Sequence, residues 1–425
     1  MTGDFMVSKS EASQPTRRAE IGSGVLAFDA ALAKLLSQAR RPVKISQVPL
    51  LQAQDRVLAA PVSSSMNVPA FDNSAMDGYA LNVADFAKPP SSFVVMQRIA
   101  AGQSGQAIEP GEAARIFTGA PVPEGTNVVV PQEQTEVRGN RVVVIGQFKA
   151  GQHIRRAGED VAVDDVVLHT GIRLEPQHLA LAASIGVAQV PVYPRLRVGV
   201  LFTGDELVEP GQVLGAGKIY NSNRYALHSL LARVGCDVVD FGVVRDSLTA
   251  TTDALHKAAG ECDVIMTCGG VSVGEEDWVK QAVTSLGSLD VWRIAMKPGK
   301  PLAFGRIGNA DFIGLPGNPV SAFVTFLVAV MPFLRQRLGL ATLTPRYQLA
   351  VAGFDWAGDA KRREFLRVRQ EPGESAQPLL ALWPNQGSAV VSGLVWADGL
   401  VDLEPGTRVN AGDAVRYVPL ADLMR

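Results

Sequence analysis

The spacing of apolar and polar residues divides the chain into stretches of different character. Residues 1–20 have no apolar period, which predicts a disordered tail. Apolar residues at helical spacing over 25–39 predict an amphipathic helix, and a second helix is expected to open at Glu175-Pro176. Between them, from 66 to 153, short β-rich runs alternate with turn residues, which is typical of a small β domain.

The stretch from 196 to 338 alternates buried strands with helices, which predicts a parallel sheet covered by helices on both faces. Ligands of such sheets bind beyond the carboxyl ends of the strands. The expected strands are 197–202, 237–244 and 263–267, and the expected helices are 223–234, 248–259, 277–286 and 319–338.

After residue 344 the pattern is β again, and short runs separated by turns predict a small barrel or sandwich of about 80 residues. The fold class is therefore α/β multidomain. The expected parts are a tail (1–22), an elongated helical domain (23–65 with 154–194), a β-rich insert (66–153), a parallel α/β domain (195–340) and a C-terminal β-barrel domain (341–425).

Composition narrows the class of protein. The 425 residues are 47% hydrophobic and 19% charged, which fits a folded protein of several domains. A net charge of -2 supplies no long-range basic field, so we expect no nucleic-acid partner. Cys236, Cys262 and Cys268 form no CxxC pair, which argues against a disulfide framework or a zinc site and favours a reducing compartment.

We expect no membrane span and a cytoplasmic location. The N-terminus lacks the apolar core of a signal peptide. The longest uncharged run, 312–334, is interrupted by Leu315-Pro-Gly-Asn-Pro319, which leaves about 15 helical residues where a span needs about 20. A buried helix is the better interpretation.

Candidate chemistry falls where the parallel strands end. One strand runs into Gly204 and Glu206, the next into Asp246, and the third into the loop from Cys268 to Asp277. Glycines in that last loop let backbone N–H groups converge on a phosphate or a pterin. A single Gly-rich loop is equally compatible with an ordinary turn. Three acid-bearing loops at equivalent strand ends favour a site.

Basic residues follow these acid-bearing loops in the sequence and can offset their negative charge. Lys297 and Lys300 flank a Pro-Gly turn downstream of Arg293, and lysines suit an oxyanion such as phosphate, sulfate or molybdate. The alternative is a solvated charged turn. Acids and lysines together indicate a divalent cation that bridges carboxylates to phosphate, with Asp246 and Asp277 as the better metal candidates.

Other polar loops are less specific. Helix initiation explains Asn318 as an N-cap and Pro319 as the first helical residue, whereas Gly317 before them indicates close approach of a ligand. In the N-terminal half, the loops that contain Asp77, Thr118 and Asp160 are, taken singly, more typical of turns. The five histidines are scattered, and no Ser–His–Asp arrangement can be argued.

From about residue 24 the chain resembles the molybdopterin molybdenumtransferases of cofactor biosynthesis and the C-terminal domain of gephyrin. The resemblance rests on seven motifs in the same order: Phe71-Asp-Asn-Ser-Ala-Met-Asp-Gly-Tyr79, Thr118-Gly-Ala-Pro121, Gly158-Glu-Asp160, Thr203-Gly-Asp-Glu-Leu207, Gly269-Gly-Val-Ser-Val-Gly-Glu275, Lys297-Pro-Gly-Lys-Pro301 and Leu315-Pro-Gly-Asn-Pro319.

The resemblance implies a four-part fold and a homodimer whose active site lies between subunits. It implies a reaction that takes adenylated molybdopterin and molybdate, releases AMP and leaves molybdenum on the dithiolene, with Mg²⁺ as the expected cation. A molybdopterin adenylyltransferase and downstream molybdoenzymes are the protein partners it implies.

Roles follow position by position from the same resemblance. Asp77, Thr118 and Asp160 would act from the N-terminal half, and Glu206, Asp246 and Asp277 would line the ligand cleft. The substrate-binding set would be Gly204, Gly269, Gly270, Ser272, Gly274, Gly317, Asn318 and Pro319. Molybdate would be held by Arg293, Lys297, Lys300, Arg363 and Ser388.

Two residues depart from the family pattern. Cys268 stands where a small hydroxyl residue is common, and Arg293 stands where lysine is usual, which changes the geometry of the charge. Two alternatives stay open. One is a gephyrin-like scaffold that binds partner peptides and would not need the cleft acids and lysines. The other is a relative that loads tungstate or handles another pterin.

Overall fold

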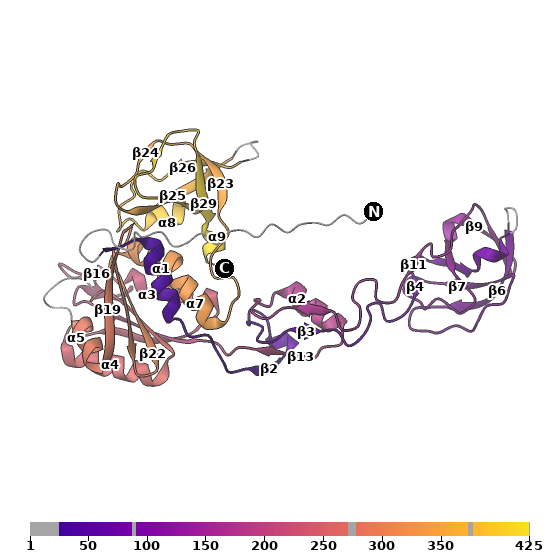
Figure 1. The fold of residues 1–425 in the computed structure, drawn as a ribbon, viewed down its shortest axis with the longest axis horizontal. Helices are drawn as coiled ribbons and strands as arrows, with labels where there is room; N and C mark the ends of the chain where they lie inside the picture. Colours follow the sequence, from indigo (N-terminus) through magenta and orange to yellow (C-terminus); the bar gives the residue numbers. More distant parts are fainter. Residues whose placement is uncertain (1–24, 87–90, 271–277, 373–376, 425) are drawn as a thin grey trace, which may run out of the picture. The chain divides into compact units, whose positions relative to one another are not determined.

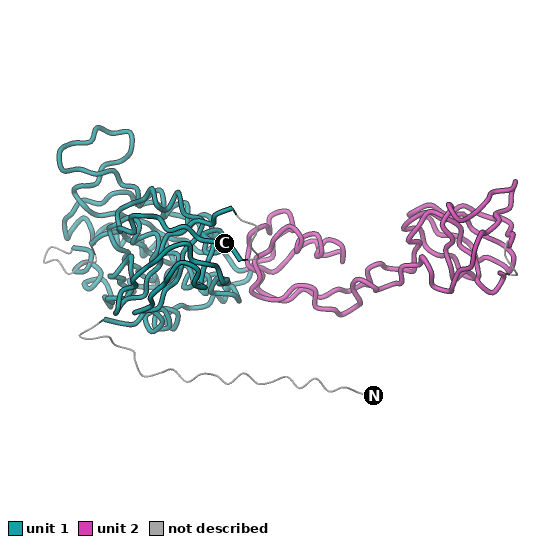
Figure 2. The backbone as a smooth tube through the Cα atoms, turned by 90° about the horizontal axis from the view of Figure 1, so that it is seen from above, with its two compact units in different colours: residues 1–45, 193–425 teal, residues 46–192 magenta. Residues whose placement is uncertain are grey.

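A computed structural model describes residues 25–86, 91–270, 278–372 and 377–424 (Figure 1). The chain divides into two compact units (Figure 2). The first unit contains residues up to 45 and from 193 onward, and the second contains residues 46–192. The second unit is therefore an insertion into the first.

A seven-stranded sheet forms the centre of the first unit, in the order β1-β19-β21-β22-β18-β14-β17. The predicted parallel arrangement is confirmed for β22, β18, β14 and β17. β21 instead runs antiparallel to both of its neighbours, so the sheet is mixed. The strands are β1 (Val25–Leu26), β14 (Arg197–Thr203), β17 (Asp237–Val244), β18 (Val264–Cys268), β19 (Gly287–Ile294), β21 (Pro301–Ile307) and β22 (Ala310–Leu315).

The antiparallel part has a local cause. β19, β21 and β22 lie in a segment for which we predicted no strand. Ile307 pairs with Ala310, so only two residues turn the chain from β21 into β22. The first of them, Gly308, has a positive φ of 58°, the conformation that tight hairpin turns require. A hairpin necessarily reverses one strand in an otherwise parallel sheet.

The predicted helices of this unit are confirmed as α3 (Ser222–Val234), α4 (Leu248–Glu261) and α5 (Trp278–Leu286). The Asn221 side chain caps α3 by accepting from Arg224 N, and Gly235, with φ 91°, ends that helix. α4 and α5 pack on one face of the sheet, where their apolar side chains form a core with residues from β14, β18, β21 and β22. α3 contacts β14 and β17.

The last helix of the sheet domain covers the predicted range, 319–338, and is longer than the uncharged run alone suggested. It comprises α6 (Pro319–Thr325), a π-helical segment (Phe326–Val330) and α7 (Met331–Leu338), 20 residues in all. Its length and composition would allow it to cross a membrane, so the length argument from the sequence was wrong. Most of the helix is buried by the rest of its unit, as a core helix is. The widened segment lets it continue through Pro332.

The first helix, α1 (Phe28–Gln38), belongs to the first unit, whereas we had grouped it in one domain with residues 154–194, most of which belong to the second unit. Its contacts explain the difference. The Phe28 ring meets Phe365 of the C-terminal domain edge-on at 5.3 Å. The Gln336 amide of α7 donates to Leu36 O and Ala39 O at the end of α1.

The C-terminal domain is a closed five-stranded barrel, one of the two architectures that the pattern of short strands predicted. Its strands are β23 (Gln348–Ala352), β25 (Arg363–Glu371), β26 (Leu379–Leu382), β27 (Gly399–Leu403) and β29 (Ala414–Pro419). A short strand of the sheet domain, β20 (Met296–Lys297), pairs in parallel with the start of β25. Backbone hydrogen bonds therefore join the barrel to the lysine turn.

The second unit has two parts. Its β-rich part is a six-stranded sheet in the order β8-β5-β7-β6-β10-β9. The other part has one α-helix among its described residues, α2 (Pro176–Ser184), and is otherwise built from short strand pairs, so it is less helical than expected. The sheet strands are β5 (Gly78–Leu81), β6 (Ser91–Ile99), β7 (Glu112–Ile116), β8 (Val128–Pro131), β9 (Thr135–Arg138) and β10 (Arg141–Val144); the pairs are β2 (Ser46–Pro49) with β13 (Gln189–Val192), β3 (Val62–Ser63) with β12 (Val166–Leu168), and β4 (Asn73–Ser74) with β11 (Ile154–Arg155).

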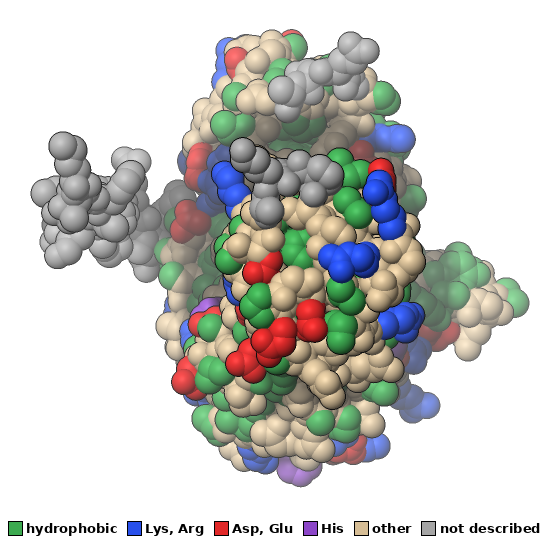
Figure 3. Space-filling model, turned by 90° about the vertical axis from the view of Figure 1, so that its right-hand side faces the viewer, with side chains coloured by type: hydrophobic (Ala, Val, Ile, Leu, Met, Phe, Trp, Pro, Cys, Tyr) green, Lys and Arg blue, Asp and Glu red, His purple; other side chains and the backbone are tan. Residues whose placement is uncertain are grey.

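The face drawn in Figure 3 carries charged side chains of both signs. In the view of Figure 3, acidic and basic side chains lie among many uncharged ones, and neither sign fills the face. That distribution agrees with the near-neutral net charge of -2.

A buried ion-pair cluster centred on Arg363 ties α1 to the barrel. The guanidinium donates to Asp402 at 2.6 and 2.7 Å and to Asp29 of α1 at 2.8 Å, and it lies 3.2 Å from Glu404. Burial alone would lower the pKa of Arg363, but the hydrogen bonds and charges of its carboxylate partners raise it.

We predict that Arg363→Met destabilises the first unit by about 3–5 kcal/mol, because it leaves the buried Asp402 carboxylate without its main partner. Denaturant unfolding of the purified protein measures the change. Lys34→Met is the control: its exposed ion pair with Asp290, at 3.7 Å, contributes no more than about 1 kcal/mol. Equal losses in the two variants would contradict a structural role for Arg363.

Candidate functional site

A cavity of about 460 Å³ lies where the sheet domain meets the barrel, within the first unit. Loops that follow β18 and β22, the turn after β20 and a loop of the barrel form its walls. The lining residues are Gly269, Gly270, Met296, Lys297, Pro298, Gly299, Lys300, Pro301, Pro316, Gly317, Asn318, Ser321, Arg362, Gln386, Gly387 and Ser388.

A second cavity, of about 590 Å³, adjoins the first. Gly269, Gly317 and Asn318 line both cavities, so the two are parts of one groove. The second cavity also contains Glu206 and Tyr220. The groove follows the carboxyl ends of β14, β18 and β22, which is where ligands of open α/β sheets bind.

Close backbone approach explains the glycines of the groove. Gly269 and Gly270 have positive φ of 89° and 63°, and a Cβ on Gly270 would lie 2.4 Å from Val279 Cγ2. A Cβ on Gly317 would lie 3.8 Å from Gly269 Cα, so the loops after β18 and β22 touch. Any side chain here would strain the backbone or fill the groove.

Three predicted residues of the same loop, Ser272, Gly274 and Asp277, lie outside the described residues.

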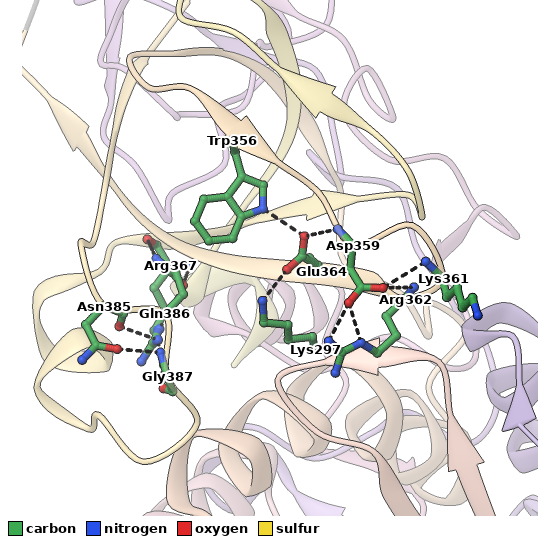
Figure 4. A network of polar contacts seen from close by, with 10 residues as sticks. All are labelled: Lys297, Trp356, Asp359, Lys361, Arg362, Glu364, Arg367, Asn385, Gln386 and Gly387. Carbon is green, nitrogen blue, oxygen red and sulfur yellow. Dashed lines mark hydrogen bonds and ion pairs between the residues drawn. The ribbon is translucent and has the colours of Figure 1, made fainter.

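Three cations line the first cavity. Lys297 Nζ lies 2.9 Å from the buried carboxylate of Glu364, which also accepts from Trp356 Nε1 and Asp359 N (Figure 4). Arg362 binds Asp359 with its side chain. Lys300 is exposed, and no ion pair joins it to another described residue. Two cations are thus balanced by carboxylates and one is not.

The structure places Arg362 in the cavity, and not Arg363 as the resemblance implied. Arg363 is occupied by Asp402, Asp29 and Glu404. Consecutive residues at the start of a strand point to opposite sides, so two adjacent arginines cannot share one role. The sequence shows the pair but not which of them faces the cavity. Arg293, also expected to bind the anion, is exposed on β19 and lines neither cavity.

Asp359 orients Arg362. The Arg362 side chain, together with the backbone N–H of Lys361, lowers the pKa of Asp359 to about 2. The carboxylate is therefore ionised throughout the physiological range. It presents the guanidinium as a fixed group at the cavity wall.

The barrel loop with Ser388 lies against the start of α6. Ser388 O accepts from Val320 N at 3.0 Å, and Asn318 Nδ2 donates to Ser388 Oγ at 3.2 Å. Asn318 occupies the N-cap position, as predicted, but its side chain makes no capping hydrogen bond. Capping therefore does not explain Asn318; its amide joins the barrel loop to the groove.

Two of the predicted acids follow strands of the sheet, and one of them lines the groove. Glu206 lines the second cavity, and a Cβ on the preceding Gly204 would lie 2.7 Å from its carboxylate. Asp246 follows β17 and lines neither cavity. The described residues contain no group of three or more His, Cys, Asp or Glu side chains that could hold a metal. Cys268 is buried at the end of β18, and burial raises the pKa of its thiol, so it stays protonated.

The remaining predicted residues are in the second unit. Thr118 N and Thr118 Oγ1 both donate to Asp77 Oδ1 at 2.8 Å, and the backbone hydrogen bond is the main cause of the lowered pKa of Asp77. Asp160 is exposed, and its N–H donates to Val68 O. Near them Asp72, which the sequence did not single out, accepts from Ala157 N at 2.9 Å and pairs with Arg156.

Family models match almost the whole chain. The MoeA N-terminal region (domain I and II) matches residues 26–186, a probable molybdopterin binding domain matches 199–336, and the MoeA C-terminal region (domain IV) matches 350–420. A sheet domain that matches a probable molybdopterin binding domain, flanked by the two MoeA regions, places the chain among the proteins of molybdenum cofactor biosynthesis. The chain belongs to the MoeA family within that class.

The chain aligns with known proteins of this family along nearly their full length. A molybdopterin molybdenumtransferase of Haemophilus influenzae is 39% identical over 94% of this chain and 100% of its own. Molybdopterin molybdenumtransferase 2 of Mycobacterium tuberculosis is 37% identical over 89% and 96%. The crystal structure of a molybdopterin biosynthesis MoeA protein from Pyrococcus horikoshii OT3 superposes with a TM-score of 0.80 at 27% identity, covering 93% of this chain and 100% of that one.

We predict that the stability of the folded protein depends on pH through the ionisation of Asp359. Its pKa in the folded protein is about 2, below its ordinary value of 3.8, so it stabilises the fold above about pH 4 and that contribution is lost as the pH falls through about 2. The stability difference between wild type and Asp359→Asn should be constant above about pH 5 and shrink toward pH 2. Chemical unfolding across this range measures it. A constant difference down to about pH 2 would show that Arg362 does not hold the carboxylate.

Proposed function

We propose that this protein is a molybdopterin molybdenumtransferase that binds adenylated molybdopterin and molybdate, transfers molybdenum to the pterin dithiolene and releases AMP. One observation carries the proposal. A single groove joins a glycine-lined cradle at the strand ends to a cavity lined by three cations.

The cradle suits the phosphates of the substrate. Gly269 and Gly270 place no side chain in the groove, with the Gly269 N–H held by Leu315 O at 3.1 Å, and Asn318 begins a helix whose N-terminal dipole favours an anion. The second cavity, with Glu206 and Tyr220, continues from there and gives room for a heterocycle.

The first cavity suits molybdate. Arg362 offers a planar fork, Lys297 and Lys300 offer compact positive charges, and the Ser388 hydroxyl adds a neutral donor. Glu364 and Asp359 neutralise two of the cations, which leaves Lys300 as the main uncompensated charge on the lysine turn. An oxyanion bound here lies at the end of the groove opposite the heterocycle.

Cleavage of the phosphoric anhydride requires neutralised phosphate charge and a positioned attacking oxygen. Molybdate, held by Lys300 and Arg362, supplies such an oxygen. Turnover with oxygen-labelled molybdate tests this step: AMP should carry the label. Unlabelled AMP during continued turnover would exclude molybdate as the source of the oxygen.

We propose Mg²⁺ as the cation at the acids of the sheet edge. Thr203 pairs in register with Val244, so Asp246 and Glu206 follow neighbouring strands. Mg²⁺ commonly takes one or two carboxylates and completes its shell with phosphate oxygens and water. Asp246 and Asp277 would hold it, and Asp277 lies outside the described residues. When bound, the cation would supply neutralisation of phosphate charge.

The protein is proposed to act as a cytoplasmic homodimer, with Asp77, Thr118 and Asp160 of one subunit completing the groove of the other. In the second unit, Thr118 and Asp77 form a polar feature held by two hydrogen bonds of 2.8 Å. A molybdopterin adenylyltransferase would supply the substrate, and molybdenum-dependent enzymes would accept the product.

We predict that Lys300→Ala raises the KM for molybdate about tenfold and lowers kcat less, because a charge-assisted contact to the anion is lost. AMP release from adenylated molybdopterin measures both constants. Lys257→Ala, on the exposed side of α4, is the control and should match wild type.

The same assay decides between the alternatives for the whole protein. A folded wild-type protein without turnover would favour a peptide-binding scaffold. Faster turnover with tungstate than with molybdate would favour a tungsten-loading enzyme.

We predict that Asp246→Ala loses Mg²⁺-dependent turnover and weakens Mg²⁺ binding in calorimetry but keeps the dimer mass in sedimentation, because Asp246 is proposed as a ligand of the cation and not as a residue of the dimer interface. Retained metal dependence would exclude the metal role. Mixing the Asp246→Ala and Asp77→Ala proteins is the matched control for the shared site. Dimers with one intact groove should regain part of the activity, whereas no recovery would contradict a site built from two subunits.

A further inference from the structure

Arg115 lies in β7 of the second unit, next to two aromatic rings. In the register of the sheet it is opposite Tyr79 of β5 and beside Arg98 of β6. Its guanidinium lies over the Tyr79 ring, 5.1 Å from the centroid, and over the Phe117 ring, 4.7 Å from the centroid. Because the strand fixes the backbone and both rings attract the cation, the side chain is confined to a small region of the sheet.

The hydrogen bonds of Arg115 reach the backbone on both sides of Asp77. Nη1 donates to Gly78 O at 3.0 Å, and Nη2 donates to Gln132 Oε1 at 2.5 Å. The Gln132 N–H in turn donates to Asp77 O at 3.0 Å. Gly78 lies tightly against β8, where a Cβ would come within 2.0 Å of Val130 O. The backbone around Asp77 is therefore held by β7 and β8 together.

Asp77 has one carboxylate oxygen engaged and one left over. Oδ1 accepts both hydrogen bonds from Thr118, which follows β7. Oδ2 accepts no hydrogen bond from any residue that the structure describes. The backbone hydrogen bond from Thr118 is the main cause of the lowered pKa of Asp77, and the charge of Arg115 adds to it. Asp77 thus presents an ionised oxygen whose position depends on the ends of three strands.

The charge of Arg115 is not neutralised by a direct partner. Both of its hydrogen-bond acceptors are neutral oxygens, and within the described part of the chain no carboxylate forms an ion pair with it. Its positive charge therefore acts on Asp77 through space.

We propose that Arg115 is a positioning residue that fixes Asp77 for the reaction. Its two hydrogen bonds hold the backbone beside the carboxylate, and its charge favours the ionised form. This role rests on the proposed function of Asp77 in completing the groove of a partner subunit. Misplacing a reacting group by about 1 Å can cost about 100-fold in rate, so even partial loosening of Asp77 is measurable.

Steady-state AMP release from adenylated molybdopterin by the whole protein provides the test. Arg115→Met should lower kcat about tenfold and leave the KM for molybdate within about twofold of wild type, because Asp77 is displaced and the molybdate cavity is untouched. Arg115→Lys keeps the charge but loses the planar fork, and it should lower kcat only about threefold.

A double variant shows whether Arg115 acts through Asp77. In an Asp77→Asn background, Arg115→Met should change kcat by less than about twofold, because the group that it positions is already disabled. A purely structural role would lower kcat in both backgrounds alike.

Two other arginines of the same sheet are the matched controls. Arg141 in β10 donates to Ser92 Oγ and Ser92 O, both at 2.9 Å, and so makes the same kinds of bond away from Asp77. Arg98 lies 4.4 Å from the Phe117 centroid and forms no hydrogen bond to a described residue, so it tests charge alone. Arg141→Met and Arg98→Gln should each keep kcat within about twofold of wild type.

Failure of the proposed function and failure of this role give different results. If Asp77→Asn turns over like wild type, the function of Asp77 is wrong and the role of Arg115 falls with it. If Asp77→Asn is impaired while Arg115→Met keeps the wild-type kcat, only the role of Arg115 is overturned. Additive losses in the double variant, or an equal loss in Arg141→Met, would also overturn it.

Two substitutes cover variants that cannot be measured. If Arg115→Met does not fold, Arg115→Lys replaces it: an unchanged kcat overturns the role, and a lowered kcat at an unchanged KM for molybdate supports it. If Asp77→Asn is too slow for a double variant to be followed, the two constants of Arg115→Met decide. A raised KM for molybdate at an unchanged kcat would then overturn the role, and the reverse would support it.

Discussion

The groove depends on two backbone pairings between β20 and β25. Met296 pairs with Arg363 and Lys297 with Glu364, so a short parallel ladder fixes the barrel to the lysine turn of the sheet domain. The Lys297–Glu364 ion pair lies at the same point, and Trp356 and Asp359 complete the environment of the buried carboxylate. Cations from the sheet domain and from the barrel are brought to one cavity because this ladder sets the register between them.

The distribution of buried charge gives the barrel two different functions. Three carboxylates form ion pairs with Arg363, and because one of them belongs to α1, these ion pairs hold α1 against the barrel. Around Arg367 only neutral oxygens are present, and the result is a loop of defined shape beside the cavity. Two arginines four residues apart on one strand thus differ in role because of their partners and not because of their own chemistry.

Much of this architecture was predictable from periodicity. α3, α4, β14 and β17 fall within a few residues of the ranges expected from the apolar pattern, because each is bounded by a clear cap or turn residue. The hairpin of β21 and β22 was missed because both strands are buried along almost their whole length and carry no alternating pattern.

The site was predictable in its loops and not in its individual contacts. Gly269, Gly317 and Lys300 line the groove as their motifs indicate. Glu364, Arg367 and the choice of Arg362 over Arg363 depend on which side of a strand a residue faces and on partners far away in sequence. A single sequence does not contain that information, because register between distant strands is settled by packing.

The insertion of residues 46–192 begins and ends on one antiparallel strand pair, in which Ser46 lies opposite Val192. The chain therefore leaves the first unit and re-enters it at neighbouring points, although a whole folded unit intervenes. Once residues 46–192 have folded, their two ends are held together, whereas a disordered loop of the same length would leave them apart. The entropic cost of bringing α1 to the sheet then no longer depends on the number of inserted residues. The strand pair therefore fixes the point of insertion. During evolution the inserted unit can lengthen, shorten or be exchanged without changing the fold that carries the groove.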